Sequence, residues 1–501
     1  MSDMGAAMQT AAQERRGSTR ERSDVADLEK QLVQNQLSPL PRNNSWSGPA
    51  IENSDMSARL REPGGFRRNF LHQQALQEGR EVDGRWSERL IDTLAVHSFQ
   101  VESHFYGLDL DEEPSAVRPV TGTAGDLNIA FLIFKGNCGC AILYMPRGWM
   151  HGGLVLASIT VPMIGLISIW CSLLLLKVRM QDSGHQGYGD LIGAAFGLYG
   201  RKCANLFIML LQSGICCTYF IVACKLLQST ICPGLGFNIL IPCMVLVVLP
   251  VVAIRKISSL WPLSLLGTAL VIFGILVVFG LELGALAHEQ PDDLILSNWS
   301  GVLVCLGQAC FMFEGIGLIL PTFDASKNPQ HFPWIYIVTQ TGTLCLVCCI
   351  GLFGYLAFGQ GVHNLILLDF QPNVLVFLVR MAFMIQVLCS FPLQMLPATR
   401  LIELSFFGPP VSDPPSARKL AKSGFRAVLV AVFALIAYAG ASHLDNFVSL
   451  IGALCGVPLA FIFPAAAHYF LIERCCSDLL LMAFGVILTV LVTAVNLAAF
   501  L

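Results

Sequence analysis

Two short stretches combine an aromatic residue, a charged residue and a glycine inside long apolar runs. They are Phe-Lys-Gly at 134–136 and Phe-Glu-Gly at 313–315, and each is followed by a further glycine, Gly139 and Gly317. Glycine is a poor helix former, and an ionisable residue inside a membrane is costly and usually functional. Both stretches therefore predict a break in a membrane helix with a charged side chain beside it.

A broken helix offers chemistry that a continuous helix lacks. Unwinding frees backbone N–H groups and carbonyls, and the ends of the two half-helices carry partial charges of opposite sign. The amides of the first break suit a carboxylate, and the carbonyls of the second suit an ammonium group. The pair predicts a site for a small amino acid. The alternative for the first break is close helix packing by small residues.

Glu314 has two alternative roles that the sequence leaves open. Burial disfavours a charged carboxylate, whereas a nearby ammonium group favours it. If Lys135 faces Glu314, the balance leaves Glu314 able to titrate in a mildly acidic compartment. Glu314 would then carry a coupled proton beside the fixed charge of Lys135. The alternative is a permanent structural contact of Glu314 with Lys135 or with unwound backbone.

Most of the candidate site residues lie at the two breaks. One further candidate, Tyr219, lies elsewhere in the sequence. Its hydroxyl either donates a hydrogen bond to the carboxylate of the substrate or only fills space. The substrate-binding candidates are Gly136, Asn137, Cys138, Gly139, Cys140, Tyr219, Phe313, Gly315 and Gly317. The proton-coupling candidates are Glu314 and Lys135. The sequence contains no nucleophile–base constellation and no metal-ligand spacing, and most of its 18 cysteines lie in apolar runs. We therefore expect no enzyme, no cofactor and no metal.

The elements that must position these residues are membrane helices. About 20 apolar residues span a bilayer as a helix, and eleven such runs predict an all-α polytopic protein. The predicted spans are 127–150, 153–176, 203–231, 236–254, 260–284, 299–322, 332–358, 373–399, 425–441, 446–470 and 479–500. With this count, the Lys and Arg residues of the loops all fall on one side. That asymmetry predicts a cytosolic N-terminus and a C-terminus on the far side.

The composition separates the chain into two parts. Of all residues, 54% are hydrophobic and 13% are charged, yet more than half of the 34 acidic residues precede Leu127. We therefore predict a largely disordered cytosolic tail over residues 1–126 and a transmembrane domain over residues 127–501. The net charge of −3 predicts that the protein has no nucleic-acid partner. The expected partners are a small amino acid, protons and membrane lipid.

The two breaks also indicate an internal repeat. They lie in the first and sixth predicted spans, and a proline follows each of them, at Pro146 and Pro321. Because five helices separate the two starts, the two units enter the membrane from opposite sides. This is the inverted repeat of many secondary transporters.

The motifs, taken together and in order, resemble the amino acid/auxin permease family over residues 127–500. The residues that carry the resemblance are Lys135-Gly136-Asn137, Pro146, Tyr188-Gly189-Asp190-Leu191, Tyr219, Phe313-Glu314-Gly315-Ile316-Gly317, Pro321 and Lys327-Asn328-Pro329. The resemblance implies a leucine-transporter-like fold of two inverted five-helix repeats plus an eleventh helix. The chain departs from the family at Gly139-Cys140-Ala141, where Gly-Thr-Gly is usual, so no particular amino acid is named.

Segments 64–70 and 105–110 of the tail resemble those that precede the membrane domain in yeast-type vacuolar amino-acid exporters. Proton-assisted amino-acid transporters share the Lys-Gly-Asn pattern, which implies protons rather than sodium as the coupling ion. We expect a secondary active amino-acid transporter, a proton symporter, in a vacuolar or lysosomal membrane rather than the plasma membrane. The alternative is an amino-acid sensor that signals through its cytosolic tail.

Overall fold

The computed structural model describes residues 124–181, 187–252, 261–288, 291, 293–407 and 416–500. Within these ranges the regular structure is helical, apart from one isolated bridge between Ala124 and Ser326. This confirms the all-α class for the described residues. The tail predicted over residues 1–126, including segments 64–70 and 105–110, lies outside them except for its last three residues.

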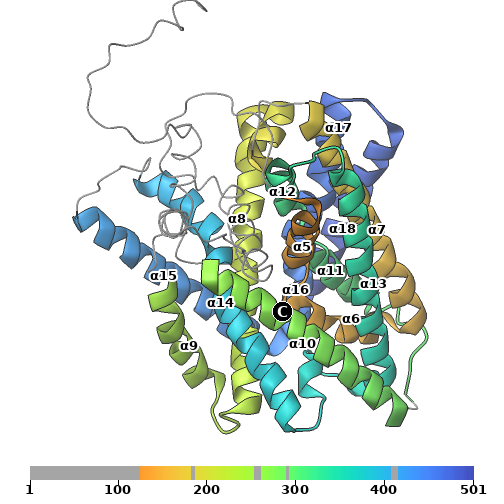
Figure 1. Cartoon of the computed structure of the whole chain (residues 1–501), viewed down its shortest axis with the longest axis vertical. Coiled ribbons are helices and arrows are strands. Elements are labelled where there is room, and N and C mark those ends of the chain that lie inside the picture. Colours follow the sequence, from red (N-terminus) through yellow and green to blue (C-terminus); the bar gives the residue numbers. More distant parts are fainter. Residues whose placement is uncertain are drawn as a thin grey trace, which may run out of the picture. The chain divides into compact units, whose positions relative to one another are not determined.

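The helices follow the predicted order (Figure 1). Their bounds are α5 Asp126–Asn137, η1 Cys140–Tyr144, α6 Met145–Gly152, α7 Leu154–Gln181, α8 Tyr188–Thr230, α9 Phe237–Val252, α10 Trp261–His288, α11 Val302–Met312, η3 Ile316–Leu318, α12 Ile319–Ala325, α13 Phe332–Phe358, η4 Gly359–Gly361, η5 Ile366–Leu368, α14 Val374–Phe407, α15 Ser416–Gly440, η6 Ala441–His443, α16 Leu444–Ile451, η7 Gly452–Gly456, η8 Pro458–Ile462, α17 Phe463–Leu471 and α18 Cys476–Ala498.

Eight helical segments of the described residues are long and apolar enough to cross a membrane, and nine if α5 and η1–α6 form one bent span. The segment 420–471, counted once, contains α15, α16 and α17, and α9 has only 16 residues. Large apolar side chains such as Leu246, Leu276 and Leu435 are exposed, as expected where lipid covers a surface. The count of eleven spans stays a prediction.

The predicted helix breaks are present at both motifs. Helix α5 ends at Asn137, Cys138 and Gly139 are extended, and the chain turns by 46° into η1 and α6. Helix α11 ends at Met312, and the chain becomes helical again at η3 and α12. The glycine-rich sequence at each break explains why the helix does not continue.

The helical unit has two sides, named here by the two halves of the first broken span. On the α5 side, the chain before α5 pairs with the end of α12 and the residues after it, through Ala124 N to Ala325 O at 3.0 Å and Lys327 N to Ala124 O at 2.9 Å. On the α6 side, the end of α6 meets the segment before α11, through Asn298 N to Gly152 O at 3.0 Å.

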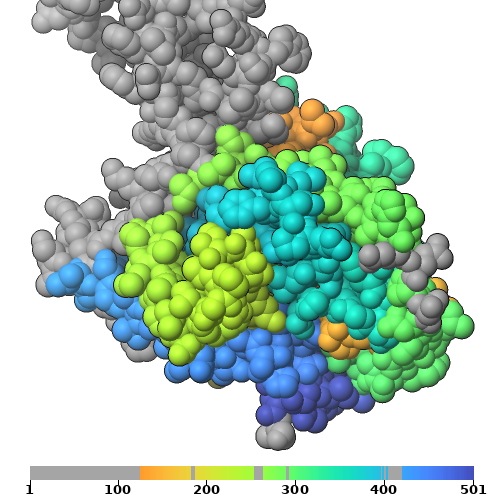
Figure 2. All heavy atoms as spheres, turned by 90° about the horizontal axis from the view of Figure 1, so that it is seen from below, coloured from red at the N-terminus to blue at the C-terminus, as the bar shows by residue number. Residues whose placement is uncertain are grey.

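Helix packing places the two broken spans inside a surround of longer helices. Helix α6 packs on α13 and α11, and α8 and α10 both pack on α14. On α13, Gly351 and Gly354 let Trp149 and Pro146 of α6 approach, because a β-carbon at either glycine would collide with those rings. Seen from the α6 side, α9, α14 and α10 cover much of the surface and little of α6 shows (Figure 2).

Candidate functional site

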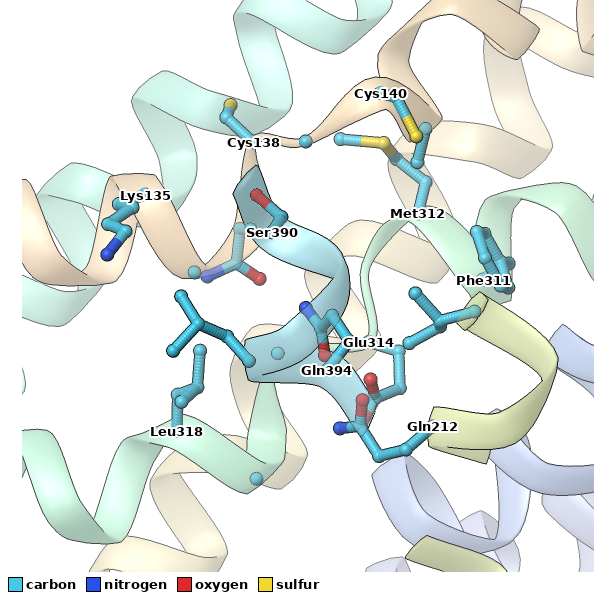
Figure 3. Close-up of a pocket in the computed structure, with 18 of the residues that line it drawn as sticks. Lys135, Cys138, Cys140, Gln212, Phe311, Met312, Glu314, Leu318, Ser390 and Gln394 are labelled. Atoms are coloured by element: carbon cyan, nitrogen blue, oxygen red, sulfur yellow. The ribbon is translucent and has the colours of Figure 1, made fainter. Parts of the chain in front are cut away.

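A pocket lies where the two breaks meet. It is lined by 134–141 of the first break and by 311–312 and 314–318 of the second, together with side chains of α8, α10 and α14. Figure 3 shows residues of the two breaks around one space, together with Gln212 from α8 and Ser390 and Gln394 from α14. The prediction that both breaks face one cavity is confirmed.

Glycine is required where the two breaks touch. A β-carbon at Gly315 would collide with the Asn137 amide, and one at Gly136 would collide with the Leu318 side chain. Asn137 cannot swing aside easily, because its Nδ2 donates to Ile133 O at 2.9 Å and its Oδ1 accepts from Gln340 at 3.1 Å. The buried amide of Asn137 thus holds one break against the other.

Backbone groups are freed at both breaks. The amides of Gly139, Glu314 and Gly315 have no hydrogen-bond partner among the described residues. The carbonyl of Phe313 accepts a bond from Ser168 Oγ of α7 at 2.9 Å. Gly139 precedes η1, and Glu314 and Gly315 precede η3, so unpaired amides lie at the start of the following helical segment at both breaks, where the partial charge is positive.

Most predicted site residues line this pocket. Those that do are Lys135, Gly136, Asn137, Cys138, Gly139, Cys140, Tyr219, Glu314, Gly315 and Gly317. Phe313 does not line it: its ring is 2% exposed and packs in the apolar core. The prediction of Phe313 as a substrate-binding residue stays a prediction, and a buried ring leaves only its backbone for that role.

Glu314 lines the pocket and forms no ion pair with any cation of the described residues. Its carboxylate has no ion pair or hydrogen bond within the described ranges, and Figure 3 shows it beside Gln212 and Gln394. Lys135 does not face it, because the Lys135 side chain points away on the far side of Leu318. Lys135 is still helical, in the last turn of α5, so its direction is set by α5 and not by the break.

A second polar cluster, which we call the α6 lock, joins α6 to α16. It consists of Arg147, His151 and Asp445. Arg147 Nε lies 3.0 Å and His151 Nε2 lies 3.1 Å from Asp445 Oδ2, and Arg147 Nη1 donates to Val362 O at 2.6 Å. Lys225 of α8 bonds Asn364 Oδ1 at 3.2 Å. None of these residues lines the pocket, so the lock joins α6 to α16 outside it.

Sequence reasoning missed three ionisable residues inside the helical unit. Arg147 follows Pro146, Lys225 lies in the apolar run of α8, and Glu282 lies between Leu281 and Leu283 of α10. An ionisable residue within an apolar run was the available signal. That signal does not identify the residue that pairs with the ionisable side chain, because the partner comes from a distant part of the chain.

Comparisons with known proteins agree with this architecture. Residues 122–501 match the family described as "Transmembrane amino acid transporter protein". "Vacuolar amino acid transporter 3" of Schizosaccharomyces pombe is 27% identical over 470 residues, 85% of this chain and 70% of the relative. "Vacuolar amino acid transporter 4" of Saccharomyces cerevisiae is 29% identical over 380 residues, 69% of this chain, and the match spans about half of that relative, 53%.

One solved structure, "Inward facing conformation of Mhp1", shares the fold. Its TM-score is 0.51 at 12% identity, with 77% of this chain and 95% of that chain covered. At this identity the likeness concerns the fold alone.

Proposed function

We propose a function from one premise: the chain belongs to the transmembrane amino acid transporter protein family. The proposed function is secondary active transport of amino acids, driven by protons, across the vacuolar membrane. The observation that carries it is the meeting of two broken helices at one pocket, with unpaired backbone amides at both breaks. The vacuolar location is supported by the names of the relatives.

The bound amino acid would lie between the two breaks. Its carboxylate would accept bonds from the amides at Gly139 and Cys140 and from the Tyr219 hydroxyl. Its ammonium group would donate to carbonyls at the end of α11. A zwitterion fits such a pair of helix ends better than an amine does, because both partial charges are then used.

Glu314 is the proposed carrier of the proton. It lines the pocket, and no described cation pairs with it. Withdrawal from water favours the protonated form of a carboxyl group, so binding and release of a proton would follow access of water to the pocket. This departs from the expected Lys135–Glu314 pair, which the observed directions of the two side chains do not support.

The fold of the proposed transporter is eleven spans in two inverted five-helix units. The first unit would run from α5 to α10, the second from α11 to α17, and α18 would be the eleventh span. Each unit begins with a broken helix, which supports the repeat. A cytosolic N-terminus would place the α5 side in the cytosol and the α6 side in the vacuole.

The test is accumulation by the purified full chain in proteoliposomes under an imposed pH gradient. Glu314→Gln keeps the shape and cannot titrate, so it should reduce accumulation to the leak level while exchange of labelled amino acid persists. Glu403→Gln is the matched control, because Glu403 is buried but is paired with Arg426 at 2.8 Å outside the pocket.

Three outcomes would contradict the proposal or a part of it. If Glu314→Gln concentrates amino acid as well as the parent, Glu314 is structural. If the parent binds labelled amino acid but transports none, the sensor alternative replaces transport. Equal transport of amines that lack a carboxylate would reject the assignment of the amides to a carboxylate.

A further inference from the structure

Glu282 is a carboxylate that the proposed transport cycle does not use. It lies in α10, is fully buried, and neither oxygen has a hydrogen-bond partner in the part of the chain that the structure describes. It does not line the pocket. A β-carbon at Gly354 of α13 would lie 2.9 Å from Glu282 Oε1 and 2.6 Å from Pro146 Cγ of α6. Glu282 therefore sits where α10, α13 and α6 meet.

The charged and titratable groups of the packed elements are engaged elsewhere. On α6, Arg147 and His151 bind Asp445. On α13, the Tyr355 hydroxyl binds the backbone of Ile295. On α14, Arg380 donates to the carbonyls of Leu367 and Phe370. No described cation is thus within ion-pair distance of Glu282.

An ionised carboxylate in this position would be unstable. Burial of a charge without a partner costs several kcal/mol, on the order of the penalty for an ion in a protein interior, whereas a neutral carboxyl group loses much less. The arrangement seen here, with Glu282 enclosed beside Gly354 of α13 and Pro146 of α6, is therefore compatible only with protonated Glu282.

We propose that Glu282 is a proton-binding site whose occupancy stabilises the packing of α6 that closes the α6 side. Helix α6 lies between two carboxyl groups with opposite requirements. Asp445 must be ionised to hold Arg147 and His151, and Glu282 must be neutral to be buried behind Pro146. When α6 moves away, water reaches Glu282 and the proton can leave. Acid then favours closure, and rising pH favours opening of that side.

This site acts on the position of α6 and is separate from the proton carried by Glu314. In the orientation proposed above, the α6 side faces the vacuole, so the acidity of that compartment would control how long the side stays closed. Only this assignment to a compartment rests on the proposed function. The pH response of α6 does not require that an amino acid is transported.

Hydrogen exchange of the α6 peptide, Met145–Gly152, tests the proposal in the full chain in lipid nanodiscs. Rates between pH 5 and pH 8 are divided by the intrinsic rates. We expect corrected exchange to be slow at pH 5 and at least about tenfold faster at pH 8, because one pH unit changes proton activity tenfold. Glu282→Gln should stay slow at both values. Glu403→Gln should respond to pH as the parent does.

Several outcomes overturn the proposal. A parent chain with pH-independent corrected exchange rejects it without any variant. So does a Glu282→Gln chain that keeps the parent's pH response. If Glu282→Gln fails to fold, Glu282→Met, apolar and of similar length, must stay slow at pH 8. Glu282→Gln should still accumulate amino acid under a gradient where Glu314→Gln does not, which separates failure of this site from failure of the proposed transport mechanism.

Discussion

The pocket and the α6 lock differ in whether the carboxylate that each contains is paired with a cation. Glu314 in the pocket has no described cation, and neutral polar side chains such as Gln212 and Gln394 lie around it. Asp445 in the lock accepts from Arg147 and His151, at 3.0 and 3.1 Å. A charge that is already paired holds two elements together, whereas a charge without a partner remains available to a ligand or a proton. The comparison separates the region proposed to bind from the region proposed to close.

The largest expected effect concerns contact between the two breaks. Gly315→Ala adds a methyl group that collides with the Asn137 amide, and Asn137 is held by Ile133 and Gln340. We expect transport to fall by about 100-fold, since a misplaced site costs about that much in a reaction that needs exact positioning. Labelled uptake in proteoliposomes measures it.

Gly280→Ala on α10 is the control, because nothing lies within 4 Å of a β-carbon there. It should transport as the parent does. If Gly315→Ala also keeps parental uptake, close contact of the breaks is not needed, and the separation between a binding region and a closing region loses its basis.

A smaller effect is expected when the α6 lock is opened. Asp445→Asn removes the charge that pairs with Arg147 and His151, and should lower the free energy of unfolding by about 1–3 kcal/mol, the cost of leaving buried polar groups unsatisfied. A double-mutant cycle with Arg147→Gln, read from melting in detergent, isolates the coupling between the two side chains. Additive losses would show that the pair does not hold α6 to α16.

The smallest effect is expected at Asp369, in the loop on the α6 side between η5 and α14. Burial raises the pKa of Asp369 above its ordinary value, although hydrogen bonds from His363 oppose this. A carboxyl group with a raised pKa in the folded state stabilises the fold below its unfolded pKa, and this contribution is lost as the pH rises through the folded pKa.

Asp369→Asn should therefore make the melting temperature less sensitive to pH between 4 and 7, by about 2 °C. His363→Ala removes the imidazole hydrogen bond to Asp369 and keeps the two bonds donated by the backbone N–H of residue 363. It removes part of the opposing effect and should have the opposite sign, with a steeper loss as the pH rises. Equal pH profiles for the parent and both variants would mean that burial does not raise the pKa of Asp369 in the folded protein.

Local features of the sequence were sufficient for the helices and their breaks. Apolar runs predicted some helices with their observed bounds, such as 332–358 for α13, which spans Phe332–Phe358. Other helices extend beyond the apolar run: α8 begins at Tyr188 and α15 at Ser416, before the predicted starts at 203 and 425. The breaks at Asn137–Cys140 and Gly315–Gly317 followed from glycine and charge in a short stretch. These properties depend on neighbouring residues, because helix propensity and hydropathy are set along the chain.

Side-chain directions and distant partners required the tertiary structure. Arg147 and Asp445 are 298 positions apart, and nothing in either segment indicates the other. The directions of Lys135 and Phe313 depend on how α5 and the second break are rotated in the packed unit. The sequence alone shows Glu282 as a carboxylate in an apolar run. Its lack of a hydrogen-bond partner depends on which residues of α6 and α13 pack around it. The sequence determined which residues lie in helices and at breaks, and packing decided which of their charges are paired, because pairing depends on helix rotation and contact across the whole chain.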